Sequence, residues 1–290
     1  MQTLTEIKHL LERGGLAPKH SLGQNFLLDH NLLRKLIESA GVQAGDTILE
    51  VGPGTGTLTE ELLARDCRVI ACELDDGLAK LLQERASAGE IPGGQHLTVI
   101  HSDCLESKEK ISAPLAVALA GVEQFKMVAN LPYGAATPLM LTLMIHHPAC
   151  TTMAVTVQRE VADRMLAEPS TPERGMLSVL AQAMCKVKRV ASLPRECFWP
   201  RPDVASAMVS LIRIANPAIT QDQRADFASF CKVLFSHRRK QLGGVLGRDF
   251  DWPQDFDPRA RAEELTLTQI QELFHIWIKR TSQQRGSDAE

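Results

Sequence analysis

Short apolar runs alternate with segments of helical spacing between residues 47 and 158. The runs are rich in β-branched residues and have the length of buried strands; they are residues 47–52, 68–73, 97–102, 126–131 and 153–158. Two intervening segments, 57–66 and 75–89, carry apolar residues at helical spacing. A repeated strand–helix–strand order predicts a parallel sheet with helices on both faces.

The pattern changes in the last third of the chain. Residues 184–193 and 207–214 alternate apolar with polar residues, which is typical of exposed or antiparallel strands. Beyond residue 214 the spacing is helical, in segments 221–235, 236–247 and 267–281. We therefore expect an α/β domain over residues 1–214 and a small all-helical domain over residues 215–290.

Composition limits the class of protein. The chain is 44% hydrophobic and 23% charged, as expected for a globular protein with a sizeable core. It has no run of about 18 apolar residues, and its first 15 residues resemble an amphipathic helix rather than a secretory signal. The seven Cys include no C-x-x-C pair. We expect a cytoplasmic protein with reduced thiols and no metal site.

The net charge of −3 conceals an uneven distribution. Residues 186–240 hold eleven Lys and Arg against four Asp and Glu, a local charge of +7, so the remainder carries −10. A basic segment on an acidic body fits a phosphate-rich partner, and it equally fits a solvated surface with uneven charge.

A glycine-rich turn follows the first predicted buried strand. The strand ends at Val51, and Gly52, Gly54 and Gly56 follow before a helix opens near Thr57. Such a turn lets a ligand approach the backbone beside a helix N-terminus. The G-x-G-x-G spacing differs from the dinucleotide pattern and suits a nucleoside without phosphates, such as S-adenosylmethionine (SAM). Tight packing of a helix is the alternative reason for these glycines.

Acidic residues close the next two predicted strands. Glu73 lies twenty-one residues after Gly52, about where this fold binds ribose hydroxyls, and Asp103 is placed to accept from an adenine amino group. Either acid alone could instead cap a helix. Ligand-type residues at successive strand ends favour a binding site, because parallel sheets bind ligands there.

The fourth strand ends in Asn130-Leu131-Pro132-Tyr133, which contains the only Tyr of the chain. An adenine N6 is a poor nucleophile that needs hydrogen-bond acceptors rather than a strong base. The Asn130 side chain and the Leu131 carbonyl could supply them, and Pro132 stiffens the turn. Tyr133 offers a flat face for a base that has left its stack. Plain packing at the strand end is the alternative for Tyr133.

Seven motifs together resemble the ribosomal RNA adenine dimethyltransferases, in the small-subunit (KsgA/RsmA/Dim-type) branch. The resemblance spans about residues 16–275 and rests on SLGQNFLLD (21–29), LEVGPGTGTLT (49–59), ACELD (71–75), NLPY (130–133), VQREVADRM (157–165), FWPRPDVASAMV (198–209) and FSHRRKQL (235–242). It implies a Rossmann-like SAM-dependent domain and a helical C-terminal domain that binds rRNA. The implied reaction is transfer of two methyl groups to N6 of each of two adjacent adenosines near the 3′ end of small-subunit rRNA.

The resemblance also implies site residues. The SAM site comprises Asn25, Leu27, Gly52, Gly54, Gly56, Glu73, Leu74, Asp103 and Asn130. The base pocket comprises Asn130, Leu131, Pro132 and Tyr133, with Phe198 expected on the opposite face of the adenine. The RNA contacts comprise Arg201, Arg238, Arg239 and Lys240, although 236–240 could also be an ordinary exposed helix face. The implied partner is an immature ribosomal small subunit, and we expect a monomer.

The sequence departs from the family pattern in three places. Gly134-Ala135-Ala136 follows NLPY, Gly175-Met176 replaces an expected Tyr, and QLGGVL follows RRK. The first change lies beside the acceptor pocket. The functional alternatives are a large-subunit rRNA adenine methyltransferase of the resistance type and a non-catalytic RNA-binding assembly factor. The presence of Gly52, Glu73, Asp103 and Asn130 favours an active enzyme.

Overall fold

The computed structural model describes residues 1–237, 239–247, 249–254 and 256–287, with only the backbone described from residue 282 on. It divides into two compact units. One comprises Met1–Ala162 and Val187–Arg213, and the other comprises Asp163–Lys186 and the residues from Ile214 on. The domain limits expected from the sequence, 1–214 and 215–290, stay a prediction. The compact units differ from them in placing 163–186 with the later residues.

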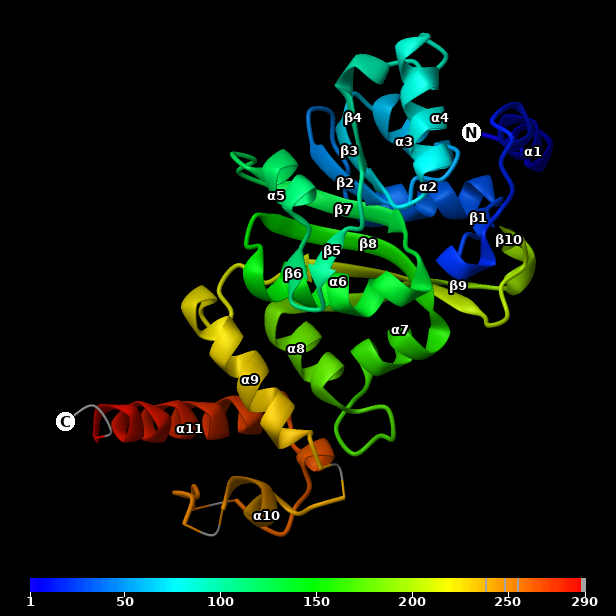
Figure 1. The fold of residues 1–290 in the computed structure, drawn as a ribbon. Helices are drawn as coiled ribbons and strands as arrows, with labels where there is room; N and C mark the ends of the chain where they lie inside the picture. The colour runs from blue at the N-terminus through cyan, green and yellow to red at the C-terminus, as the bar shows by residue number, and fades with distance from the viewer. Residues whose placement is uncertain (238, 248, 255, 288–290) are drawn as a thin grey trace. The chain divides into compact units, whose positions relative to one another are not determined.

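A seven-stranded sheet forms the centre of the first unit (Figure 1). Its strands lie in the order β4 (Leu97–His101), β3 (Arg68–Glu73), β2 (Thr47–Val51), β7 (Phe125–Asn130), β8 (Cys150–Gln158), β11 (Ser206–Arg213) and β9 (Cys185–Leu193). The first five run parallel, and β11 is antiparallel to β8. The predicted α/β class is confirmed, and each predicted strand is present within a few residues of its expected bounds.

Helices cover both faces of the sheet, because successive strands are added first toward one edge of the sheet and then toward the other. The helices of this unit are α1 (Leu4–Arg13), α2 (His30–Ser39), α3 (Thr57–Leu63), α4 (Asp76–Ser87), α5 (Ala113–Leu119) and α6 (Tyr133–His146). Right-handed crossovers from β2 to β3 and from β7 to β8 run in opposite directions, so α3 and α6 lie on opposite faces. The apolar core on one face joins α2, α3 and α4 to alternate residues of the strands, such as Ile48, Val69 and Val128.

The sheet has a switch point between β2 and β7. From β2 the order proceeds one way through β3 and β4, and the other way through β7 and β8. In parallel sheets the crevice outside the carboxyl ends of two such strands binds ligands. Two short sheets lie elsewhere in the chain, one pairing β1 (Phe26–Leu27) with β10 (Phe198–Trp199), the other pairing β5 (Leu105–Ser107) with β6 (Lys110–Ile111).

Among the described residues of the second unit, the regular structure is helical apart from the start of β9. Its helices are the end of α7 (Arg159–Leu166), α8 (Met176–Met184), α9 (Arg224–Leu234), α10 (Leu242–Leu246) and α11 (Leu267–Ser287). Edge-to-face packing of Phe227 and Phe274, with ring centroids 5.1 Å apart, joins α9 to α11. Of the helix expected over 236–247, the described residues form only the short α10.

Candidate active site

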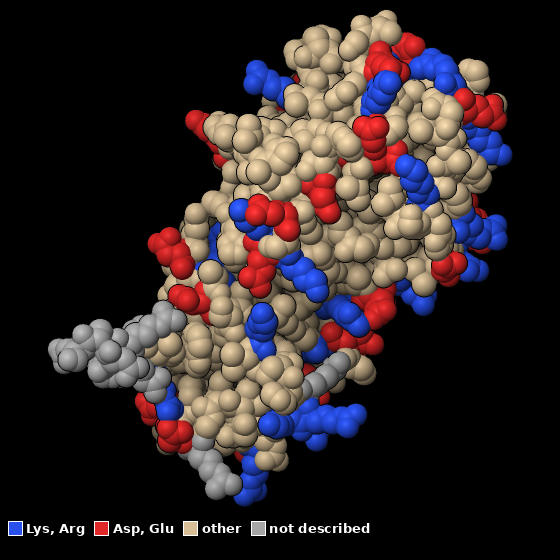
Figure 2. All heavy atoms as spheres, viewed as in Figure 1, with Lys and Arg blue, Asp and Glu red and all other residues tan. Residues whose placement is uncertain are grey.

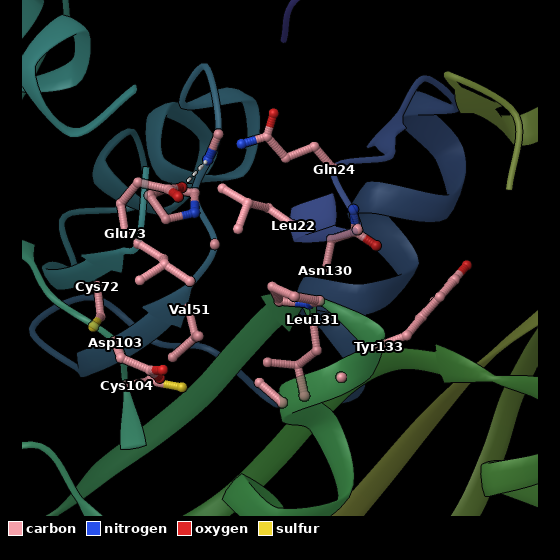
Figure 3. A pocket seen from close by; sticks show the side chains of 18 of the residues that line it. Leu22, Gln24, Val51, Cys72, Glu73, Asp103, Cys104, Asn130, Leu131 and Tyr133 are labelled. Atoms are coloured by element: carbon pink, nitrogen blue, oxygen red, sulfur yellow. Dashed lines mark hydrogen bonds between the residues drawn. The ribbon is translucent and has the colours of Figure 1, made fainter. Parts of the chain in front are cut away.

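A cavity of about 670 Å³ opens at the switch point (Figure 3). Its walls come from the segment 20–27, from the turns after β2 and β3, from residues 102–108 after β4, and from the start of α6. Of the residues expected at the SAM and base sites, the cavity is lined by Asn25, Leu27, Gly52, Gly54, Glu73, Leu74, Asp103, Asn130, Leu131, Pro132 and Tyr133. Segments distant in the sequence thus meet at one place, as the parallel topology predicts.

The glycine turn contains two positions that other residues would not fit. Gly54 has φ +59°, and a Cβ there would lie 2.8 Å from Cε1 of Phe26 on the cavity wall. Gly56 has φ +94°, and a Cβ there would lie 2.7 Å from Cδ1 of Leu82. Gly56 does not line the cavity, so it serves the packing of α3 on α4. A ligand in the cavity could therefore approach the backbone at Gly52 and Gly54, and not at Gly56.

Glu73 is fixed by two backbone amides. Its Oε2 accepts from the N–H of Gly54 at 3.2 Å, and its Oε1 accepts from the N–H of Asp75 at 2.9 Å. The side chain is 5% exposed, and burial raises its pKa while these hydrogen bonds lower it. Each carboxylate oxygen has a further lone pair for a hydroxyl group in the cavity.

Asp103 and Leu74 also line the cavity, and Asp103 lies on the same side of it as Glu73 (Figure 3). Asp103 is exposed, and its Oδ1 accepts from the N–H of Leu105 at 2.9 Å. Leu74 is unusual for an apolar side chain in being 49% exposed. An open apolar surface beside a carboxylate suits a flat ring with a hydrogen-bonding edge.

Asn130 is held by two partners that fix the orientation of its amide. Its Nδ2 donates to the carbonyl of Asn25 at 2.7 Å, and its Oδ1 accepts a hydrogen bond from the hydroxyl of Thr156. Since an amide oxygen has two lone pairs, Oδ1 can accept one more hydrogen bond. The Thr156 side chain is wholly buried, so it aligns Asn130 from behind the cavity.

Tyr133 begins α6, directly after Pro132. Its hydroxyl is hydrogen-bonded to the hydroxyl of Ser206, which is 1% exposed at the start of β11. The ring extends away from Glu73 and Asp103, beyond Asn130 (Figure 3). The hydroxyl therefore holds the ring in position at the far end of the cavity from the two acids.

Phe198 does not reach the cavity in this structure. It pairs with Leu27 between β10 and β1, is only 4% exposed, and packs in the core with Leu33. The position facing Tyr133 was expected for it from the resemblance. The aromatic residues that do line the cavity are Phe26 and Tyr133.

Three of the expected RNA contacts, Arg201, Arg239 and Lys240, are described in the structure and do not line the cavity. Arg201 is exposed, with an ion pair to Glu196 at 3.6 Å, and Arg239 and Lys240 are exposed beyond α9. Arg238 lies outside the described residues. On the face shown in Figure 2, Lys and Arg are interspersed with Asp and Glu. The contribution of these residues to RNA binding stays a prediction.

The structure adds residues that motif reasoning did not assign. Glu50 lines the cavity while only 2% exposed, and Gln24 lines it while donating to Asp75 at 3.4 Å. Gln24 lies in the motif SLGQNFLLD and Glu50 in LEVGPGTGTLT, so their presence in these motifs could have indicated a place at the site. Ser206 also lies in one of the motifs, FWPRPDVASAMV (198–209). Thr156 lies outside all of them and gave no signal, because its contact with Asn130 depends on the pairing of β8 with β7.

Two kinds of feature are absent from the described part of the chain. Within it, no group of three or more His, Cys, Asp or Glu side chains gathers as a metal site. None of the helices described is both long and apolar enough to cross a membrane.

Structural comparison identifies related folds. A dimethyladenosine transferase from Plasmodium falciparum aligns with a TM-score of 0.71 and 23% identity, covering 88% of this chain and 98% of that one. The 23S rRNA methyltransferase ErmE aligns with a TM-score of 0.65 and 24% identity, covering 87% and 98%. At these identities the alignments establish a shared fold.

Sequence comparison identifies the family. Ribosomal RNA small subunit methyltransferase A of Geobacillus kaustophilus is 33% identical over 279 residues, covering 92% of this chain and 93% of the relative. The protein of that name from Magnetococcus marinus is 37% identical over 273 residues, covering 92% and 94%. The profile of the ribosomal RNA adenine dimethylase family matches residues 16–279. The chain belongs to the ribosomal RNA adenine dimethylase family.

Proposed function

We propose that this protein is a SAM-dependent rRNA adenine-N6,N6-dimethyltransferase. Its substrate would be two adjacent adenosines near the 3′ end of small-subunit rRNA, methylated during assembly of the subunit. The observation that carries the proposal is one cavity that joins two carboxylates, Glu73 and Asp103, to an oriented Asn130 beside Tyr133. The carboxylates suit a nucleoside, and the Asn–Tyr end suits a base.

The residues present fit SAM. A volume of about 670 Å³ lies within the range of small-molecule sites, roughly 300–1,000 Å³. Glu73 would hold the ribose hydroxyls through its remaining lone pairs, and Asp103 with Leu74 would hold the adenine of the cofactor. Gly52 and Gly54 would leave room for the part of the molecule that carries the methyl group. When bound, SAM supplies an activated methyl group on a sulfonium ion.

Asn130 would act on the acceptor nitrogen of the target adenine. The N6 lone pair is delocalised into the ring, so a hydrogen bond from N6–H to Asn130 Oδ1 helps the nitrogen to rehybridise. The donor from Thr156 keeps Oδ1, rather than Nδ2, directed to that task. Fixed acceptors of this kind stabilise charge as it develops at the reacting atom. The Tyr133 ring would hold the base by stacking, worth about 1–3 kcal/mol.

The exposed cations Arg201, Arg239 and Lys240 would contact rRNA phosphates outside the cavity. We further propose that the protein works as a monomer in the cytoplasm, on immature small subunits. These points rest on the family and on the local charge of +7 in residues 186–240.

The test is methylation of isolated rRNA particles followed by mass spectrometry of the nucleosides. Immature small subunits lacking the modification should gain N6,N6-dimethyladenosine at two adjacent positions when protein and SAM are added. Asn130→Ala protein is the matched control and should yield little product. Product on large-subunit rRNA instead would favour the resistance-type reaction, and absence of product on both would contradict the proposal.

A further inference from the structure

Gln2, which precedes α1, inserts its side chain against the glycine turn. The side chain is 5% exposed although the residue stands far from the turn in sequence. Its Nε2 donates to the carbonyl oxygen of Thr55 at 3.0 Å, and its Oε1 accepts from the hydroxyls of Thr55 at 2.7 Å and Thr57 at 3.0 Å. Thr57 itself lines the cavity. The amide thus binds the outer side of the turn whose inner side faces the cavity.

The hydrogen-bonding capacity of the Gln2 amide is fully used. The second N–H of Nε2 donates to Oε1 of Glu60 at 2.7 Å, so two donors and two acceptor lone pairs all have partners. A carboxylate at position 2 would lose both donors and would face Glu60 with a like charge. A side chain without polar atoms would remove the acceptor of two buried threonine hydroxyls, Thr55 and Thr57. The contacts therefore specify glutamine.

A buried cation, Arg85, completes the support of the turn. Arg85 of α4 donates from Nη1 to the same Thr55 carbonyl at 2.7 Å and from Nη2 to Glu60 Oε1 at 2.7 Å. On the inner side, the Gly54 N–H donates to Glu73. The turn is thus held from α4, from Glu73 and from Gln2, and Gln2 is the contact that comes from outside the sheet and its crossover helices.

α1 carries Gln2 to this position through its own packing. Ile7, Leu10 and Leu11 form an apolar cluster with Leu78 and Leu81 of α4. The helix begins after Thr3, whose hydroxyl accepts from the N–H of Glu6 at 3.3 Å in a capping box. Docking of α1 and the shape of the glycine turn are therefore connected by one buried amide.

We infer that Gln2 is a positioning residue for the cofactor site, and that docking of α1 and binding of SAM stabilise each other. The inference rests on the proposed use of SAM. Because Gln2 binds the turn in the shape that leaves the cavity open, a ligand that binds this shape favours the docked α1. By thermodynamic linkage, the docked α1 favours the ligand by the same factor.

Calorimetric titration of SAM into purified variants tests the inference without RNA. Gln2→Ala should weaken SAM affinity about 5- to 20-fold, and Gln2→Glu at least as much because of Glu60. Thr3→Ala is the matched control, since it removes the cap of the same helix without touching the turn. It should lower the melting temperature comparably while changing SAM affinity less than 2-fold.

Two further readouts separate positioning from general stability. With immature subunits as substrate, Gln2→Ala should raise the KM for SAM while kcat at saturating SAM stays within about 2-fold of the unsubstituted protein. Amide hydrogen exchange in α1 should slow when SAM is added to the unsubstituted protein, and much less in Gln2→Ala.

Equal SAM affinity in Gln2→Ala and the unsubstituted protein would overturn the inference, as would equal weakening by Thr3→Ala or unchanged exchange in α1. Failure of the unsubstituted protein to bind SAM at all would instead overturn the cofactor assignment on which the inference rests.

Discussion

Glu50 should make the stability of the protein depend on pH. It is 2% exposed on the cavity wall, and its Oε2 accepts a hydrogen bond from the Thr59 hydroxyl at 2.7 Å. Burial raises its pKa from 4.5 to about 8; the charge of Glu73 raises it too, and the Thr59 hydrogen bond lowers it. The folded protein therefore keeps this carboxyl protonated at pH values where the unfolded chain ionises it.

The sign and the size of the effect follow from proton linkage. Between pH 4.5 and about 8, the unfolded state binds fewer protons at this position than the folded state, so the free energy of unfolding falls as pH rises. The stability from protonated Glu50 is fully present below pH 4.5 and is lost as pH rises through the folded pKa. At about 1.4 kcal/mol per pH unit, the whole window corresponds to roughly 5 kcal/mol.

Glu50→Gln should remove this dependence, because glutamine keeps the size of the side chain and an acceptor for Thr59. Urea unfolding without SAM should show the variant gaining about 3–4 kcal/mol relative to the unsubstituted protein between pH 5 and pH 8. Glu84→Gln, on the exposed side of α4, should leave the pH profile unchanged. If the free energy of unfolding changes with pH in the same way in Glu50→Gln and in the unsubstituted protein, Glu50 is not protonated in the folded state.

Three other predictions concern the acceptor end and RNA. Thr156→Val keeps the shape of a buried side chain but removes the hydroxyl that orients the Asn130 amide. Methyl transfer should therefore fall about 5- to 10-fold, as expected for one lost hydrogen bond, with an unchanged melting temperature; an unchanged kcat would contradict this. Tyr133→Phe should retain the ring but lose its hydrogen bond to Ser206, which reduces methyl transfer about 3- to 10-fold, and Tyr133→Ala should reduce it further. The SAM affinity measured by calorimetry should change little in both variants, and equal methyl transfer by the two would exclude stacking. Replacing Arg239 and Lys240 by Ala should reduce the slope of log RNA affinity against log salt by about 0.7–0.9 per lost phosphate contact; an unaltered slope would remove them from the interface.

The sequence predicted those parts of the site that depend on neighbouring residues. Buried β-branched runs define the strands, and ligand-type residues directly after them, such as Glu73 and Asn130, reach the cavity because parallel strands end at one edge. It did not predict contacts that depend on packing between distant segments. Phe198 begins the loop FWPRPDVAS, but its strand pairs with β1 at Leu27 and its side chain is buried in the apolar core. The buried role of Gln2 likewise depends on where α1 packs, and one glutamine before a helix gives no signal.

The pairing of β1 with β10, together with the contact of Tyr133 with Ser206, has a consequence for synthesis of the chain. A nascent polypeptide that ends before residue 198 already contains the glycine turn, Glu73, Asp103 and Asn130. It lacks the strand that pairs with Phe26 and Leu27, and the serine that anchors the Tyr133 ring. The end of the cavity that Tyr133 lines can therefore be completed only after residue 206 has left the ribosome, so the cavity reaches its final shape late in translation of the chain.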